Sequence, residues 1–76
     1  MNARERMGQR ISQLRIERGL TQTDLADRSG LGQGHIARIE QGKYGMTLDT
    51  LQAIAEALDM TVDIIDKRLA GLTRID

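Results

Sequence analysis

Residues 22–41, QTDLADRSGLGQGHIARIEQ, decide the fold of this chain. They contain two short amphipathic segments, the first followed by Gly30 and the second by Gly42. So few residues separate the two segments that the chain has no room to reverse its direction. The two segments are therefore predicted to be helices that cross at a steep angle.

Single residues within this stretch suit such a crossing. Ala26 is small where the two helices would approach most closely, and Gly30 suits a sharp turn with a positive φ. Apolar contacts from Leu31, Ile36 and Ile39 would hold the second helix against the first. A steep crossing also pushes the second helix outward, which is the geometry of a helix-turn-helix that enters a DNA groove.

Length and composition limit the classes of protein. The 76 residues suffice for one domain, residues 1–76, with a small core. Cysteine is absent, which excludes a disulfide framework and a thiolate metal site. No apolar run is long enough to span a membrane, and the N-terminus lacks the apolar core of a signal peptide. We therefore expect a soluble, cytoplasmic protein.

The distribution of charge favours a nucleic-acid partner, although the formal net charge is +0. Arginines concentrate in the first twenty residues and aspartates in the last third, so one end of the molecule can present a positive face. Tyr44 is the only aromatic residue, which argues against stacking of single-stranded bases. Double-stranded DNA is the partner that these features favour.

Helical patterns extend along most of the chain. Met7, Ile11 and Leu14 lie on one face of a helix predicted from about Ala3 to Arg18, which Gly19 ends. A capping residue between two apolar residues then recurs at three further helix starts: Leu20-Thr21 with Leu25, Leu31-Gly32 with Ile36, and Met46-Thr47 with Leu51. The last of these helices continues through Leu58. These patterns predict an all-α bundle.

The segment 60–66 has two interpretations. Met60-Thr61 with Ile65 repeats the capping pattern and favours a fifth helix, whereas residues 60–64 also alternate as a strand does. We expect the helix, with the strand as the alternative.

Residues 67–76 are either a loose tail or a dimer contact through Leu69, Leu72 and Ile75, and we favour the dimer contact.

Over residues 18–65, the sequence resembles the phage-repressor/Cro-like helix-turn-helix family, often called Xre. These residues read RGLTQTDLADRSGLGQGHIARIEQGKYGMTLDTLQAIAEALDMTVDII and carry the family pattern of Gly-Leu-Thr-Gln, Ile-Glu-x-Gly and Thr-Leu-x-x-Leu. The resemblance implies a lambda-repressor-like compact bundle of about five short helices. It also implies a homodimer on a two-fold symmetric operator, with no cofactor.

The resemblance assigns DNA contacts to Gln22, Gln33, Gly34, His35, Ala37, Arg38 and Lys43. Gln22 would bond a phosphate and brace Gln33, which would read a base edge, and adenine suits its amide. Arg38 would pair with guanine or phosphate, and Ala37 would touch a thymine methyl. Lys43 and the backbone amides after Gly42 would hold phosphate. His35 is either a DNA contact or simply exposed.

The resemblance also assigns structural roles to Arg15, Glu40, Ala26, Gly30 and Ile36. It implies that Arg15 and Glu40 form an internal salt bridge, as the matching pair does in relatives.

Two glycines depart from the family pattern, because relatives commonly have Ser or Thr at Gly32 and a bulkier polar residue at Gly34. Glycine inside a helix costs about 1 kcal/mol relative to alanine. Gly34 therefore either lets the backbone approach DNA closely, or it reduces the number of bases that the protein reads, because it offers no side chain to a base.

We expect a sequence-specific transcriptional regulator, in particular a repressor. His35 has no second histidine or cysteine for a metal site, and no nucleophile motif surrounds Ser29, so an enzyme is not expected. The alternative is an antitoxin that binds a toxin protein and autoregulates its operon, and a strand at 60–66 would support it. A restriction–modification controller is indistinguishable from a repressor at this level.

Overall fold

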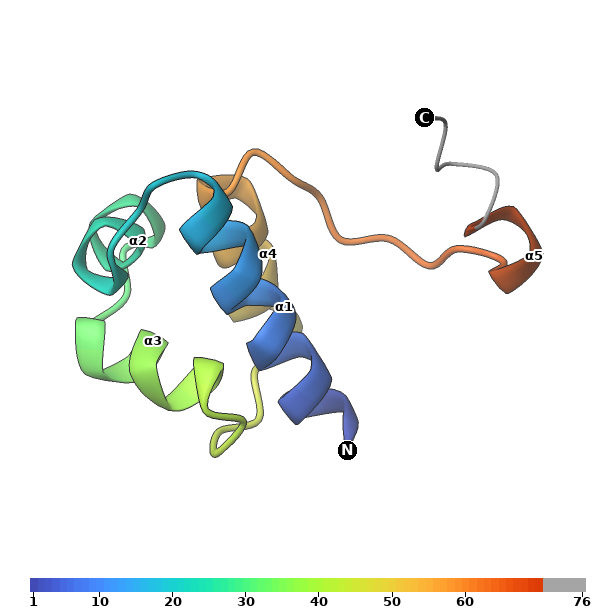
Figure 1. The fold of residues 1–76 in the computed structure, drawn as a ribbon, viewed down its shortest axis with the longest axis horizontal. Coiled ribbons are helices and arrows are strands. Elements are labelled where there is room, and N and C mark those ends of the chain that lie inside the picture. The colour runs from blue at the N-terminus through green and yellow to red at the C-terminus, as the bar shows by residue number, and fades with distance from the viewer. Residues whose placement is uncertain (71–76) are drawn as a thin grey trace.

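Four helices and one short helical turn make up the described part of the chain, residues 1–70 of a computed structural model. The helices are α1 (Ala3–Glu17), α2 (Gln22–Ser29), α3 (Gln33–Glu40) and α4 (Leu48–Ala57), and α5 (Lys67–Ala70) is the turn. α3 packs on α1 and α2, and α2 also packs on α4 (Figure 1). Residues 1–70 contain no strand. The predicted all-α fold and its four helices are confirmed.

Side chains just before three helices cap their first turns. The cap oxygens of Asn2, Thr21 and Thr47 accept N–H groups from Glu5 (2.9 Å), Asp24 (3.0 Å) and Thr50 (3.1 Å), respectively. Each bond satisfies a donor that the helix itself leaves unpaired. α3 follows Gly32, which has no side chain to make such a bond. The predicted starts at Thr21 and Thr47 are those observed.

The core lies among α1 to α4 and consists of apolar residues at helical spacing. Its largest fully buried side chains are Leu25, Ile36, Ile39, Ile54 and Leu58. Ile11, Leu14, Leu20 and Ala26 complete the buried cluster, and Leu31, Met46, Leu51 and Ala57 pack on it half-buried. Met7, expected on the apolar face of α1, is 37% exposed. It lines a shallow apolar pocket between α1 and α4.

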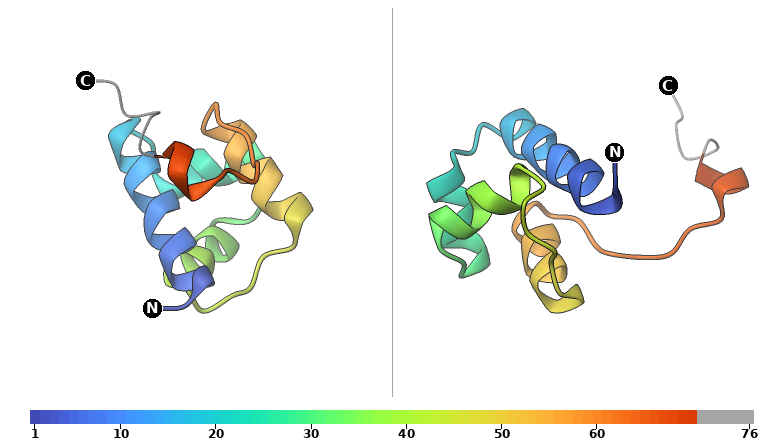
Figure 2. Two further views of the ribbon diagram at one scale, coloured as in Figure 1. Left: turned by 90° about the vertical axis from the view of Figure 1, so that its right-hand side faces the viewer. Right: turned by 90° about the horizontal axis from the view of Figure 1, so that it is seen from below.

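Neither structure expected for residues 60–66 forms. Asp59 adopts φ 60°, and the N–H of Met60 bonds the carbonyl of Ala55 (2.8 Å), so the chain leaves the axis of α4 there. The segment then leads away from the four-helix body, and helix resumes only at α5 (Figures 1 and 2). The expectation of a helix was wrong, and so was the alternative of a strand.

Local hydrogen bonds and poor burial explain why residues 60–66 are irregular. The carboxylate of Asp63 accepts the N–H of Ile64 (2.7 Å), a bond that competes with helical pairing. Ile65, the apolar residue of the capping pattern, is 55% exposed and Ile64 is 97% exposed, whereas Val62 is half-buried beside the α1–α4 pocket. The expected dimer contact depends on the side chains of Leu69, Leu72 and Ile75, which lie outside the part of the chain that is described.

The carboxylate of Asp24, at the start of α2, makes the stability of the fold depend on pH in the acidic range. Its carboxylate accepts the backbone N–H of Thr21 (2.9 Å), and this bond, followed by the Thr21 hydroxyl, lowers its pKa below the ordinary value of 3.8. A lowered pKa stabilises the fold above about pH 3.8, and the contribution is lost as pH falls through the folded-state pKa. Asp24→Asn should therefore lower the free energy of unfolding at pH 7, and the difference from the wild type should shrink below pH 3.8.

Urea unfolding at neutral and acidic pH would measure this difference. Asp27→Asn removes an exposed carboxylate of α2 outside the capping box and serves as the matched control. A deficit of Asp24→Asn that stayed constant down to acidic pH would contradict the role of the charge.

Candidate nucleic-acid interface

The turn between α2 and α3 sets the direction of α3. Gly30 ends α2 with a left-handed φ of 76°, and the N–H of Leu31 bonds the carbonyl of Ala26 (3.1 Å). Ala26 is buried, so the two helices approach closely beside the turn. α3 begins at Gln33, only three residues after Gly30, and it crosses α2 steeply (Figure 1). The structure therefore brings together the small residue and the glycine that the sequence singles out.

α3 has one buried side and one exposed side. Ile36 and Ile39 are completely buried in the core, and they attach the helix to the body. Gln33, Gly34 and Arg38 are exposed, whereas Ala37 is half-buried beside them. Because residues four apart lie on the same side of a helix, Gln33 with Ala37 and Gly34 with Arg38 form one continuous outer surface.

His35 does not extend freely into solvent. It is half-buried, its ring meets the ring of Tyr44 edge to face at 4.7 Å, and its Nε2 has no hydrogen-bond partner among residues 1–70. Aromatic pairs favour this arrangement, which holds the loop after α3 against the helix. Of the two expectations for His35, simple exposure is wrong.

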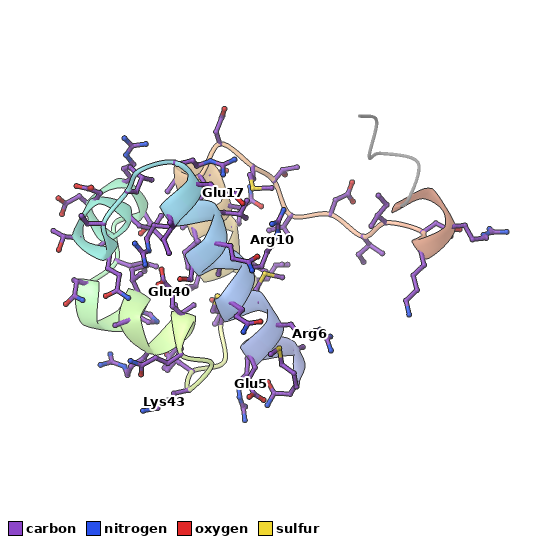
Figure 3. All side chains as sticks on the ribbon, in the orientation of Figure 1. Glu5, Arg6, Arg10, Glu17, Glu40 and Lys43 are labelled. Atoms are coloured by element: carbon purple, nitrogen blue, oxygen red, sulfur yellow. The ribbon has the colours of Figure 1, made fainter. Side chains whose placement is uncertain are left out.

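The loop after α3 uses one of the amides that were expected to hold phosphate. Gly42 has a left-handed φ of 74°, and the N–H of Lys43 bonds the carbonyl of Arg38 (3.1 Å). This bond closes the end of the helix, so the Lys43 amide is already engaged. The Lys43 side chain is exposed beyond the C-terminal end of α3 (Figure 3). Of the two Lys43 groups that were expected to hold phosphate, the ammonium group is exposed and the backbone N–H is bonded within the loop.

A chain of four polar side chains connects α1 to the exposed end of α3. Arg15 donates to both carboxylate oxygens of Glu40, from Nε (2.7 Å) and Nη2 (3.0 Å). Gln22 Nε2 donates to Glu40 Oε1 (3.2 Å), and Gln33 Nε2 donates to Gln22 Oε1 (2.8 Å). We call these residues the polar relay. It joins three helices, since Arg15 is on α1, Gln22 on α2 and the other two on α3.

The inner end of the polar relay is shielded from water. The side chains of Arg15 and Glu40 are 13% and 6% exposed, and Arg15 Nη1 also donates to the carbonyl of Leu20 (2.8 Å). The hydrogen bond to Glu40 raises the pKa of Arg15, so the guanidinium stays charged. Charged, two-pronged hydrogen bonds of this kind are short and directional. Figure 3 shows Glu40 between α1 and α3, inside the body.

Two glycines that the sequence analysis did not single out as site residues position the C-terminal end of α3. A Cβ on Gly8 of α1 would overlap the carbonyl oxygen of Ile39, and one on Gly42 would lie 2.8 Å from Glu5 Cγ. Both glycines therefore allow α1 and the end of α3 to touch through their backbones. The available signal was a glycine inside the amphipathic pattern of α1, which often marks a close approach.

Three basic residues of α1, Arg6, Arg10 and Arg15, do not extend the outer surface of α3. Arg10 lines the pocket between α1 and α4, and both Arg6 and Arg10 lie on the side of α1 away from α3 (Figure 3). Arg15 is paired inside the body with Glu40. α3 itself and the loop that follows it contribute two exposed cations, Arg38 and Lys43.

Gly34 provides a test of how much stability a glycine inside α3 costs. A Cβ there would meet only Arg38 Nη1, at an ordinary contact distance of 3.6 Å, so alanine fits. Gly34→Ala should raise the free energy of unfolding by about 0.4–1 kcal/mol, because alanine restricts the unfolded chain and favours helix. Urea unfolding would measure this, and an equal or lower stability would contradict it. Gly45→Ala, in an open loop position outside the helices, is the control.

Comparison with known proteins agrees with this geometry. A helix-turn-helix family model matches residues 11–65. The chain belongs to the Xre/Cro-like helix-turn-helix family. The solved structure of the restriction-modification controller protein C.AhdI from Aeromonas hydrophila is similar, with a TM-score of 0.74 and 35% identity over 75% of this chain and 86% of that one.

Two repressors are similar in sequence. The immunity repressor protein of Bacillus phage phi105 is 44% identical over 59 residues, which are 78% of this chain and 41% of the repressor. The transcriptional repressor RghR of Bacillus subtilis (strain 168) is 44% identical over 55 residues, 71% of this chain and 41% of that protein. The matched stretch therefore covers less than half the length of either repressor.

Two further features of residues 1–70 concern metal ligands and membrane-spanning helices. No three histidine, cysteine or carboxylate side chains of that part cluster closely enough to hold a metal ion. None of its helices has both the length and the apolar character that crossing a membrane requires.

Proposed function

We propose that this protein is a sequence-specific DNA-binding transcriptional regulator that represses by occupying a promoter. One observation carries the proposal: α3 is anchored by the buried Ile36 and Ile39 while its opposite side presents Gln33, Gly34 and Arg38 to solvent. A helix held in this way can lie in the major groove with its first residues at base edges. Membership of the helix-turn-helix family supports the same function.

The residues of the outer surface suit a division of tasks. Gln33 and Arg38 carry the amide and guanidinium groups that bond base edges in the major groove. Gln22 retains a second N–H beyond the one given to Glu40, and this N–H can meet a phosphate. Lys43 adds a positive charge at the other end of α3. We infer that Gln22 and Lys43 position the helix while Gln33, Ala37 and Arg38 contact bases.

A homodimer on a two-fold symmetric operator is part of the proposal. α3 is only eight residues long, and one small module seldom holds a specific site by itself at physiological salt. Two copies would place their α3 helices in successive major grooves, about 34 Å apart. Selection from a random duplex library at physiological salt, with the mass determined in parallel, tests this. A symmetric site enriched by a dimer is expected, and a lack of any enriched site would overturn the proposal.

Arg38→Ala tests base recognition separately. The variant should weaken binding to the selected site by about 1–3 kcal/mol and relax base preference at one position of each half-site. Binding titrations on the selected duplex and its single-base variants measure both effects. Arg10→Ala is the matched control, because Arg10 lies by the α1–α4 pocket and not beside α3. An equal loss on all duplexes, with a shallower salt dependence, would assign Arg38 to a phosphate instead.

A second candidate is a restriction–modification controller, favoured by the similarity to C.AhdI along most of that protein's length. A controller would bind DNA through the same outer surface of α3. The two candidates are therefore distinguished by where the selected DNA site lies in the genome. A site ahead of a restriction or methylation gene would favour the controller. The antitoxin alternative has no such support, because the strand that would favour it does not form among residues 60–66.

A further inference from the structure

We propose that Glu40 fixes the direction of the Gln33 side-chain amide and thereby makes the protein prefer adenine to guanine at the base that Gln33 reads. Glu40 is then a positioning residue that determines specificity without touching DNA. The inference rests on the proposed DNA-binding function. It follows from the direction of each hydrogen bond in the polar relay, Arg15–Glu40–Gln22–Gln33.

The direction of the polar relay is set at its inner end. A guanidinium can only donate hydrogen bonds and an ionised carboxylate can only accept them, so the Arg15–Glu40 pair has one direction. An amide can present either its oxygen or its nitrogen. Against the Glu40 carboxylate, Gln22 must present its nitrogen, and the observed bond is Nε2 to Oε1 at 3.2 Å. The oxygen of Gln22 is thereby directed toward Gln33.

The same constraint passes to Gln33. Because Gln22 presents an oxygen, Gln33 must give it an N–H, and this bond is the shorter of the two, at 2.8 Å. One N–H and the carbonyl oxygen of Gln33 then remain for DNA. Gln33 is exposed at the first turn of α3, whereas the Glu40 side chain that sets its direction is 6% exposed. Water therefore competes little for the group at which the direction is set.

One free donor and one free acceptor match adenine and not guanine. In the major groove, adenine presents the N7 acceptor beside the N6 amino donor, so both free groups of Gln33 find partners. Guanine presents two acceptors, N7 and O6, and would need two donors. The second donor of Gln33 is already committed to Gln22. The carbonyl oxygen of Gln33 would then face an acceptor of guanine, which is unfavourable.

Glu40→Gln tests the proposal with almost no change of shape. The new amide can accept from Gln22 as the carboxylate does, or donate to it, and in either arrangement it loses one of the two bonds from Arg15. The two directions of the relay become similar in energy, and the reversed direction leaves both N–H groups of Gln33 free for guanine. We expect the wild type to prefer adenine by about tenfold, within the range for a two-pronged base contact. In the variant this preference should fall by most of that factor.

The readout is the ratio of dissociation constants for two duplexes that differ only in adenine or guanine at one position. That position is the one where Gln33→Ala abolishes base preference in the selected site. A merely structural role of Glu40 would weaken binding to both duplexes equally and leave the ratio unchanged, so an unchanged ratio in a folded Glu40→Gln variant would overturn the proposal. Circular dichroism establishes that the variant is folded.

Gln22→Met breaks the polar relay without touching the ion pair and keeps the test decisive if Glu40→Gln unfolds. It should reduce the adenine-to-guanine ratio as Glu40→Gln does, in addition to a uniform loss of affinity. Gln52→Met, on α4 and outside the relay, is the matched control and should keep the wild-type ratio. If the wild type itself enriches no duplex, the proposed function fails. If it enriches a site and both relay variants keep its ratio, only this inference fails.

Discussion

Ile36→Ala should lower the free energy of unfolding by about 3 kcal/mol, within the range of 2–5 kcal/mol for truncating a buried isoleucine. Ile36 is 0% exposed and belongs to the cluster that joins α3 to the rest of the core. Removing its outer carbons takes away apolar burial and leaves a cavity that the surrounding helices fill only in part. A domain of this size is stabilised by about 5–10 kcal/mol in total, so the loss is a large fraction of it.

Urea unfolding followed by circular dichroism measures this loss as a lower midpoint with an unchanged slope. Ile16→Ala makes the same chemical change at a position of α1 that is 63% exposed, and it should alter stability by less than about 0.5 kcal/mol. Equal effects of the two substitutions would show that Ile36 is not at the centre of the core. DNA binding by Ile36→Ala should fall with the folded fraction, because α3 loses one of its two anchors.

Glu40→Ala should cost up to about 3 kcal/mol of stability, the lower end of the range for a buried ion pair, because this pair is shielded but not fully buried. The guanidinium of Arg15, 13% exposed, would remain inside the body without its carboxylate. Gln22 would also lose its acceptor, so the bond that braces Gln33 would lose its support. The Glu40→Ala variant should therefore lose both stability and base preference. The Ile36→Ala variant should lose stability, and its DNA binding should fall only because less of it is folded.

Thermal or urea unfolding at low and high salt distinguishes a shielded pair from a surface pair. The deficit of Glu40→Ala should change little with salt, because solvent ions screen a shielded pair weakly. Asp66→Ala breaks the exposed Asp66–Arg68 pair, in which Arg68 is 89% exposed, and should produce no measurable loss. A deficit that disappears in high salt would place the Arg15–Glu40 pair at the surface and contradict the structure.

The helices could be predicted because their signals are local. Thr21 and Asp24 are three residues apart, and the reciprocal bonds that begin α2 depend only on that spacing. The steep crossing of α2 and α3 could be predicted as well, since the short turn at Gly30 leaves no other path. Residues 60–66 show the limit of such signals. Their capping pattern resembles the other helix starts, but Ile65, the apolar residue of that pattern, is 55% exposed, and the helix does not form.

The residues of the interface also divide into those that local signals could predict and those that they could not. The exposed side of α3 follows from the spacing of Ile36 and Ile39, so Gln33 and Arg38 could be placed on it from the sequence. The close approach at Gly8 could not, because the group that excludes a side chain there is a carbonyl of α3, far along the chain. The contact of His35 with Tyr44 likewise depends on how the loop after α3 folds back.

By itself, the sequence determined the four helices, the caps of α2 and α4, the turn at Gly30 and the side of α3 that faces outward, because these depend on hydrogen bonds and apolar spacing within a few residues. Only the tertiary structure decided the path of residues 60–66, the close packing at Gly8 and the direction of the Gln33 amide. The packing at Gly8 and the direction of the Gln33 amide depend on groups from separate helices, and the path of residues 60–66 depends on how little of Ile65 the four helices bury. Arg15 and Glu40 lie 25 positions apart, and no local pattern places a distant donor against its acceptor.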